Sequence, residues 1–566
     1  MRARSAAAPL YALALTLAVT APLFTPGYLL LRDAVSTPRS YLSDSALGLS
    51  QAAPRALPQD YAVALASTVL DGGVVVKMLL ILGLWSAGWG AARLTASALP
   101  DAGVAGQCVA VTIAIWNPYV AERLVQGHWS LLVGYGCLPW VAATMLRVRT
   151  DQPESRVGGN EFALLFWIAL AGLTPSGLML AATIALVAGL APGGGRSRTW
   201  CAVVCMGAAT VAALPWLVAS VVAGGWTSTV DESGVAAFAA RAEPGLGTLG
   251  SLASLGGIWN ADAVPASRTT LFALVSAAVL LTVVAVGVPL LVRRRRAVPL
   301  LVLAAAAVVL PAAMATGPGL AALEAVVRAA PGLGVLRDGQ KWVALAVPGY
   351  ALAGAAAIIT LRPRIPAAAA ATVSCAALVA TLPDLAWGVG GQVSPVQYPP
   401  GWSAAASIIN DDPRPVAVLP VDSMRQFPWA GDAPVLDPLP RWVRAEVFST
   451  GDLNISGRTV RGEGAYAREV QRMLISGADQ GQLAAAGVGW VVVEGPSPGL
   501  ALPVAYHDAD MTVYAVGGDA TASAHRGLML VAHAVWLAQL GLGLGGMLVG
   551  RLRRRRGRAV PSTPSE

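Results

Sequence analysis

Apolar runs of about twenty residues recur along the whole chain, and they limit its fold more than any other feature. One such run covers residues 8–31, another covers 74–92, and a third covers 527–549. An α-helix needs roughly 20 apolar residues to cross the hydrocarbon core of a bilayer. Only 12% of the residues are charged, about half the share in an average soluble protein. The sequence therefore predicts an α-helical polytopic membrane protein.

We expect about twelve transmembrane helices on this length criterion. Two of them are short, because Thr174, Pro175 and Gly177 interrupt the apolar stretch 162–191. Short spans broken by Gly and Pro are typical of helices that line a cavity. The remaining spans are expected at 8–31, 74–92, 104–116, the segment returning to Arg147, 200–223, the segment ending at Arg293, the segment before 317, the segment returning to Arg362, the segment ending at 383, and 527–549.

The arginines predict the orientation of these spans. The two densest runs lie at 293–296 and 553–556, and loops rich in Lys and Arg stay in the cytosol. Both ends are therefore expected in the cytosol of a bacterial plasma membrane, with outer loops at 32–73, 117–130, 224–268 and 317–340. The net charge of +8 then follows from topology and indicates no nucleic-acid partner.

A long polar segment near the C-terminus predicts a separate domain. Residues 384–526 are long enough to fold independently, with strand-like runs at 416–419, 490–493 and 512–516 and helical patterns at 403–409 and 465–475. We expect a small extracytosolic α/β domain there. The membrane domain would then cover residues 1–383 with eleven spans, and 527–566 would hold the final span and a basic cytosolic tail.

The polar stretch 116–129 separates two apolar runs. Asn117 and Pro118 are typical of a helix start, and Gly127 of a helix stop. We expect a short helix on the membrane surface, with Trp116, Tyr119 and Trp129 in the aromatic belt. Its side chains Glu122, Arg123, Gln126 and His128 either face lipid headgroups or line a site at the outer face.

Three further polar clusters lie in the predicted outer loops, whereas the spans carry few ionisable groups. They are Arg32, Asp33 and Arg39 with Asp44 nearby; Arg241, Glu243, Trp259, Asn260 and Asp262; and Arg337, Asp338, Gln340 and Lys341. A carboxylate there could accept a proton from a sugar hydroxyl or bind a divalent cation. Arginine or lysine could hold a phosphate. Membrane anchoring or local salt bridges would account for the same clusters without a reaction.

Four motifs resemble the GT-C class of integral-membrane glycosyltransferases. They are Leu-Arg-Asp at 31–33, Gly-His-Trp at 127–129, Val-Leu-Arg-Asp-Gly-Gln-Lys-Trp at 335–342, and the run at 482–493, which is similar to the outer domain of arabinofuranosyltransferase-like envelope proteins. The resemblance implies a polyprenyl-phosphate-linked sugar donor and an envelope glycan acceptor. The chain departs from the class in one respect, because the usual pair of adjacent acids is reduced to Asp33 alone.

The resemblance also implies roles for individual residues. Asp33 would be the catalytic base, assisted by Glu122 or His128. The sequence leaves the need for a metal open; if a divalent cation (Mg or Mn) is used, Asp33 and Asp44 are its candidate ligands. The residues expected to bind substrate are Arg32, Arg123, Arg337, Asp338, Lys341, Trp259 and Asn260.

Two function classes remain open from the sequence. The first is a polyprenyl-phosphate-sugar-dependent glycosyltransferase acting at the outer face of the plasma membrane in cell-envelope glycan assembly. The second is a non-catalytic membrane scaffold, or a carrier or transporter of lipid-linked glycans. Transport is disfavoured because ion-coupled transporters place charges or broken helices near the bilayer midplane, and the spans here are nearly uncharged.

Overall fold

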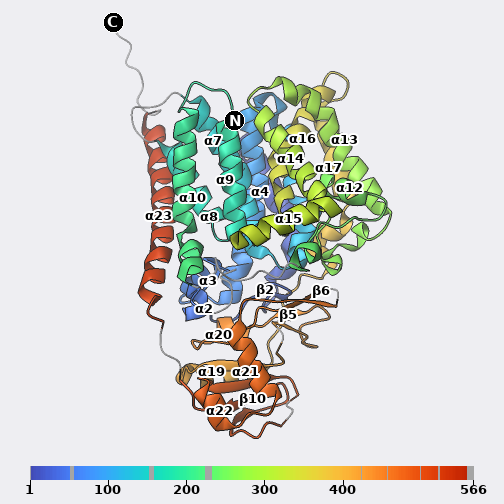
Figure 1. Cartoon of the computed structure of the whole chain (residues 1–566). Helices are drawn as coiled ribbons and strands as arrows, with labels where there is room; N and C mark the ends of the chain where they lie inside the picture. Colours follow the sequence, from blue (N-terminus) through green and yellow to red (C-terminus); the bar gives the residue numbers. More distant parts are fainter. Residues whose placement is uncertain are drawn as a thin grey trace.

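A computed structural model describes residues 2–50, 56–151, 158–222, 233–421, 423–455, 457–496, 499–519 and 523–557. The start of the predicted outer loop 224–268 (residues 224–232) and the tail after residue 557 lie outside the described residues. The described chain forms a bundle of long helices with a smaller part, containing a β-sheet, at one end (Figure 1). The start of α1 and the end of α23 lie at the opposite end of the bundle.

Within the described residues, eight helices are long and apolar enough to cross a membrane. Two further pairs of helices meet that criterion only together, because they bend by 93° between α14 and α15 and by 75° after α17. The interrupted stretch forms two shorter apolar helices, α8 and α9, separated at Thr174 as the sequence predicts. The helices of the bundle are α1 (Arg2–Thr20), α4 (Gly72–Ala98), α5 (Gly103–Ile115), α7 (Trp129–Thr150), α8 (Gly159–Ala171), α9 (Pro175–Gly189), α10 (Arg198–Val222), α13 (Phe272–Arg293), α14 (Val298–Met314), α15 (Gly317–Ala329), α16 (Val347–Leu361), α17 (Ala367–Ala380) and α23 (Arg526–Gly557).

The first helix is shorter than expected. The apolar run reaches residue 31, but α1 ends at Thr20 and a 3₁₀ turn (Ala21–Phe24) follows. Pro22 and Pro26 explain the difference, because proline lacks the N–H that a continuing helix needs. The last part of the run instead enters a β-hairpin that carries Asp33.

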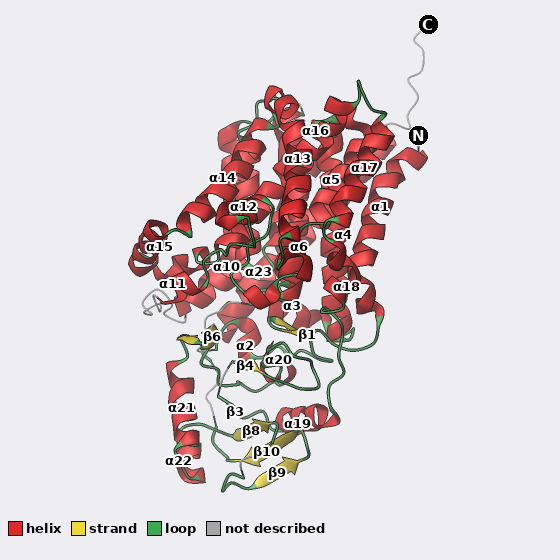
Figure 2. Cartoon of the chain, turned by 90° about the vertical axis from the view of Figure 1, so that its right-hand side faces the viewer, coloured by secondary structure: helices red, strands yellow, loops and turns green. Residues whose placement is uncertain are grey.

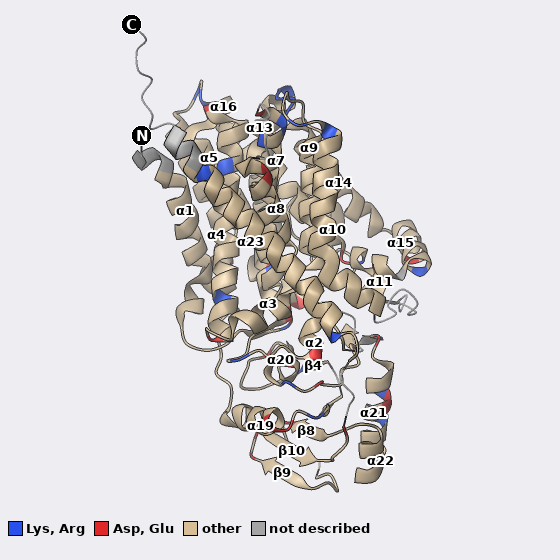
Figure 3. Cartoon of the chain, turned by 90° about the vertical axis from the view of Figure 1, so that its left-hand side faces the viewer, with Lys and Arg blue, Asp and Glu red and all other residues tan. Residues whose placement is uncertain are grey.

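Small residues allow the central helices to pack closely. A Cβ on Gly136 of α7 would lie 2.1 Å from the Gly83 carbonyl oxygen of α4, and one on Gly287 of α13 would lie 1.8 Å from the Ala353 oxygen of α16. Such approaches are the usual basis of helix association in membranes, where apolar burial provides little driving force. Figure 3 shows few charged residues along the middle of the helices.

The sheet has four strands in the order β3-β8-β10-β9. Strands β3 (Val416–Leu419) and β8 (Trp490–Glu494) are parallel, whereas β10 (Met511–Ala515) is antiparallel to both β8 and β9 (Val504–His507). The predicted strands and helices are all present, the helices as α19 (Pro400–Asp411) and α21 (Ala465–Ile475). Strand β9 was not predicted, and its residues are mostly exposed.

A β-hairpin joins the sheet part to the bundle. Strands β1 (Leu30–Leu31) and β2 (Ala34–Val35) pair around Arg32 and Asp33. Leu30 and Val35 are buried in the same apolar cluster as Trp402 of α19, and the Arg32 backbone exchanges hydrogen bonds of 2.9 Å with Pro434 and Leu436 beside β5 (Val435–Leu436). Figure 2 shows β1 at this junction. The hairpin therefore belongs to the core of both parts.

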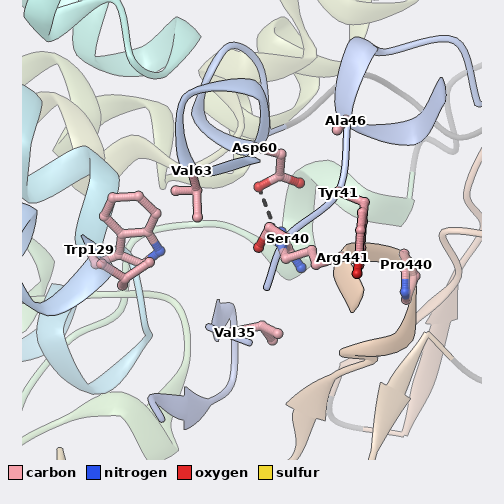
Figure 4. Close-up of a pocket in the computed structure, with 10 residues that line it drawn as sticks. Val35, Ser40, Tyr41, Ala46, Asp60, Val63, Trp129, Pro440 and Arg441 are labelled. Atoms are coloured by element: carbon pink, nitrogen blue, oxygen red, sulfur yellow. Dashed lines mark hydrogen bonds and ion pairs between the residues drawn. The ribbon is translucent and has the colours of Figure 1, made fainter. Parts of the chain in front are cut away.

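The junction holds a second contact, between Asp60 of α3 (Gln59–Ala66) and Arg441 of α20 (Leu439–Trp442), at 3.2 Å (Figure 4). The cavity beside this pair is about 10 Å³, room for about one water molecule. It is too small for a substrate. The remaining short elements are α2 (Asp44–Leu47), α6 (Pro118–Val125), α11 (Ser233–Ala237), α12 (Gly247–Ala253), α18 (Ala386–Gly390), α22 (Gln480–Ala485), β4 (Met424–Arg425), β6 (Leu453–Ile455) and β7 (Arg458–Val460).

Candidate functional site

The short helix predicted between the apolar runs is present as α6. The Asn117 side chain accepts a hydrogen bond from the Val120 N–H, Pro118 occupies the first helical position, and Gly127 follows with φ +84°. The helix does not lie on a membrane surface, however, because all of its residues are buried in protein. Tyr119, Trp116 and Trp129 are buried too, so the predicted aromatic belt is not formed by these side chains.

Arg123 of α6 is the centre of a buried ion network. Its guanidinium donates to both Asp338 carboxylate oxygens, at 2.8 and 3.0 Å, and also to the Gln340 side-chain oxygen. The Tyr119 ring lies 5.5 Å below the cation. The side chain has no exposed surface. A buried charge needs this kind of bidentate pairing to offset the loss of water.

His128 connects this network to Asp33. Its Nδ1 lies 3.0 Å from an Arg123 nitrogen, and its Nε2 lies 3.1 Å from the Asp33 carboxylate. Guanidinium groups only donate hydrogen bonds, so Nδ1 must be the acceptor and Nε2 must carry the proton. Arg123 thereby fixes the tautomer in which His128 donates to Asp33.

The hairpin and α6 together position Asp33. Its carboxylate also accepts from the Gln126 amide at 2.8 Å, and Gln126 in turn accepts from Asn260 at 2.8 Å. Arg32, the preceding turn residue, has φ +49°, a strained conformation for a side chain of this size. A Cβ on Gly127 would lie 2.3 Å from the Ala34 nitrogen, so only glycine allows the hairpin to approach α6 this closely.

Three members of the network reach its exposed surface. The Asp33 side chain is 40% exposed, Lys341 25% and His128 17%. The Lys341 ammonium lies 3.6 Å from Asp338, which links it to Arg123. The Asp33 carboxylate, the His128 imidazole and the Lys341 ammonium therefore form one accessible patch. The buried ion pair of Arg123 and Asp338 lies beneath it. The structure thus brings together Asp33, His128 and Lys341, which come from three separate polar clusters of the sequence.

Their ionisation follows from this arrangement. Burial raises the pKa of the Asp33 carboxyl, but hydrogen bonds from His128 and Gln126 and the charge of Lys341 outweigh it and hold the pKa below its ordinary value. Burial lowers the pKa of His128, and neighbouring Arg123 and Lys341 oppose the effect of Asp33, so His128 stays neutral over a wider range. The pKa of Asp338 is also lowered, because Arg123 and Lys341 outweigh its burial.

Two residues expected to act in the reaction instead hold the backbone. Glu122 is fully buried and accepts from the Gly257 and Ile258 N–H groups at 3.0 and 3.1 Å. Arg32 is also buried and donates to the Val125 and Asp262 carbonyls at 2.8 and 2.7 Å. Neither side chain reaches the patch, because each is needed to satisfy buried peptide groups.

Two other predicted substrate-binding residues lie in a separate aromatic cluster. Arg337 stacks on Phe238 at 5.3 Å, and Trp259 meets the same ring edge-on at 4.7 Å. The predicted run at 337–341 is therefore divided, with Asp338, Gln340 and Lys341 facing Arg123. Gln126 and Gln340 had no predicted role. In the structure they connect residues of different clusters, and such distant contacts leave no local sequence pattern.

A divalent cation fits the described residues poorly. Within them, no group of three or more His, Cys, Asp or Glu side chains is placed to hold a metal. Asp44 is ion-paired with Arg526, and Asp33 faces a histidine donor and an amide donor. Hard cations prefer several oxygen ligands, whereas Arg123 and Lys341 make this neighbourhood favourable for an anion.

The comparisons with known proteins bear on the fold. No family model and no curated protein matches the chain. Among solved structures, the cryo-EM structure of arabinofuranosyltransferase AftD from mycobacteria is similar, with a TM-score of 0.56 and 17% identity. The chain shares the fold of the matched part of this arabinofuranosyltransferase. The match covers 92% of the chain and 40% of AftD, so the chain spans less than half of that protein. The resemblance inferred from the sequence motifs is confirmed for the fold.

Proposed function

We propose that the chain is a glycosyltransferase of the cell envelope that uses a polyprenyl-phosphate-linked sugar as donor and an envelope glycan as acceptor. The observation that carries this proposal is the exposed carboxylate of Asp33. It lies in the patch with His128 and Lys341, above the buried ion pair of Arg123 and Asp338. The similarity to an arabinofuranosyltransferase fold supports the same reaction class. Fold alone does not define an activity, so the site geometry is the main argument.

The proposed step assigns one task to each exposed residue. The acceptor hydroxyl oxygen forms a bond to the anomeric carbon of the sugar, and the bond from that carbon to the donor phosphate oxygen breaks. The hydroxyl proton passes to the Asp33 carboxylate, which its lowered pKa keeps ionised at neutral pH. Lys341 pairs with the departing polyprenyl phosphate. His128 and Asn260, the latter through Gln126, position Asp33 without touching the reacting atoms.

The proposal includes a topology. Twelve spans with both ends in the cytosol would place the sheet part and Asp33 at the outer face of a bacterial plasma membrane. Both ends of the described chain lie at one end of the bundle and the sheet lies at the other (Figures 1 and 2), which supports an even number of crossings. The basic loops at the first end agree with a cytosolic side (Figure 3).

The first prediction tests Asp33 directly. We expect Asp33→Asn to lower transfer by about 100-fold or more, the range for loss of a general base, while the protein stays folded and abundant. The measurement is transfer by the purified full chain, together with envelope glycans from cells carrying each variant. Asp262→Asn is the matched control, because that side chain is exposed and Asp262 makes its hydrogen bonds to Arg32 and Asn260 through its backbone. Full activity of Asp33→Asn would remove Asp33 from the mechanism.

A non-catalytic carrier of lipid-linked glycans is the second candidate. It is favoured by one observation: a second carboxylate of the network, Asp338, is paired with Arg123 and Lys341 and is nearly inaccessible, so it offers no second acid for a reaction. If Asp33→Asn retains binding of the lipid-linked sugar and cells lacking the gene make unchanged glycans, this candidate replaces the enzyme. Activity assays with and without EDTA test separately whether transfer needs Mg or Mn.

A further inference from the structure

A large cavity opens at the end of the bundle opposite Asp33. Its volume is about 700 Å³. It lies where α1, α5, α16 and α17 meet, at the far end of the segment that begins near Lys341. About twenty mostly helical residues separate Lys341 from Arg362 at the cavity, a distance of roughly 30 Å. The cavity is therefore separate from the proposed donor site. Its lining residues are Ala7, Asp101, Ala102, Gly103, Val104, Ala105, Ile358, Ile359, Arg362 and Ala367.

The wall of the cavity is apolar and is built from small side chains. Alanines from α1, α5 and α17 line it together with Val104 and the paired isoleucines of α16. A Cβ on Gly103 would meet no atom within 4 Å, so the space beside it is open. The volume falls within the range of small-ligand sites, about 300–1,000 Å³. An apolar recess between membrane helices is suited to a hydrocarbon chain.

The rim of the cavity is cationic. Arg362 caps the C-terminal end of α16 and is exposed. Among the described residues no carboxylate lies within ion-pair distance of it. Asp101, the acidic lining residue, is paired with Arg294 at 3.0 Å, so its charge is already compensated. Within the part of the chain that the structure describes, the Arg362 guanidinium therefore lies at the rim without a compensating carboxylate.

We propose that this cavity binds an anionic phospholipid, with an acyl chain against the apolar wall and the phosphate on Arg362. Guanidinium groups form strong, geometrically specific hydrogen bonds with phosphate oxygens. Basic pockets between membrane helices are a known mode of headgroup binding. The lipid would fill the space between α1 and α17 and stabilise their contact with α5 and α16. This inference does not depend on sugar transfer.

The test uses the purified full chain in nanodiscs or detergent with phosphatidylglycerol or phosphatidylcholine as the added lipid. Native mass spectrometry measures bound lipid, and thermal unfolding measures the stabilisation it provides. We expect Arg362→Gln to weaken phosphatidylglycerol binding about tenfold. Arg364→Gln is the matched control, because Arg364 lies two residues further along and does not line the cavity. Ala367→Phe fills the cavity and should reduce binding of the acyl chain.

The outcomes separate the candidate occupants. The proposal is supported if phosphatidylglycerol binds more tightly than phosphatidylcholine and if this preference is lost in Arg362→Gln but kept in Arg364→Gln. It is overturned if both lipids bind equally, or if Arg362→Gln and Ala367→Phe bind phosphatidylglycerol like the wild type. Binding of an added polyprenyl phosphate in place of phosphatidylglycerol would show that the assigned occupant is wrong. Loss of activity in Asp33→Asn would affect none of these results.

Discussion

At the scale of single residues, the state of Asp33 depends on a chain of donors. Arg123 requires His128 Nδ1 to accept, and His128 Nε2 must then donate to Asp33. A neutral imidazole is sufficient for this arrangement, and the lowered pKa of His128 is consistent with it. His128 is therefore a positioning residue that stabilises the ionised carboxylate.

A pH profile tests this role of His128. Because the pKa of Asp33 is lowered, the acidic limb of kcat/KM should fall below the ordinary carboxyl range in the wild type. His128→Ala removes the hydrogen bond that lowers the pKa of Asp33 most, so this pKa should rise and the acidic limb of kcat/KM should move to higher pH. Asp262→Asn is the control, since the Asp262 side chain is exposed and makes no hydrogen bond to Asp33. A lower plateau with the limb unchanged would indicate that His128 supports the fold alone.

Gly127 gives a second prediction at this scale. We expect Gly127→Ala to reduce transfer strongly, because the new Cβ would strike the Ala34 nitrogen and the Leu31 oxygen, at 2.3 and 2.4 Å, and displace the Asp33 turn. The backbone penalty of about 1–2 kcal/mol for a left-handed alanine is shared by Gly391→Ala, whose φ is +89° and whose Cβ would meet nothing within 4 Å. Equal activity of Gly127→Ala and Gly391→Ala would show that the close approach of Gly127 to the hairpin does not hold Asp33 in place.

At the scale of elements, local signals predicted α6 and distant contacts decided its environment. Asn117, Pro118 and Gly127 specify where the helix begins and ends, because capping and left-handed turns depend on neighbouring backbone groups. Nothing local indicates that Arg123 meets Asp338, 215 residues away. A polar helix was therefore expected at the membrane surface, whereas other segments of the same chain cover it.

The difference between local patterns and distant contacts also explains which other sequence-based predictions agree with the structure. Strands β3, β8 and β10 were predicted because short apolar runs bounded by turn residues are local patterns. Glu122 was given a catalytic role and Arg32 a substrate-binding role because their partners, the backbone groups near residues 257 and 262, lie in a distant loop. The structure brings Asp33 and His128 to 3.1 Å and links Lys341 to them through Asp338 and Arg123, an arrangement of three outer-loop clusters that sequence spacing does not indicate.

The buried ion pair of α6 predicts a large stability effect. Asp338→Asn should destabilise the protein by about 3–5 kcal/mol, since it leaves the buried Arg123 without its carboxylate. Unfolding in mild detergent with added denaturant measures this change. Arg294→Gln is the matched control: it breaks the Asp101 pair, whose side chains are about half exposed, and exposed pairs contribute about 0–1 kcal/mol. Similar losses for both variants would argue against a continuous buried network.

At the scale of the whole molecule, the sheet part and the bundle share the element that carries Asp33. One face of the sheet packs on the cluster that contains Trp402, Leu30 and Val35. The other face packs on a separate cluster with Leu474 of α21. A change in the first cluster therefore reaches the hairpin, whereas a change in the second stays within the sheet part.

Two truncations of buried side chains separate these effects. Trp402→Ala and Leu474→Ala should each cost the sheet part a few kcal/mol, about 3–5 and 2–5 kcal/mol for these residue types. Only Trp402→Ala should also lower sugar transfer at a temperature where both variants remain folded, because it loosens the support of the Asp33 turn. Hydrogen exchange at residues 30–36 should rise in that variant alone. If both variants lose transfer in proportion to their stability, the hairpin is not the mechanical link, and the sheet part would influence the site only through global unfolding.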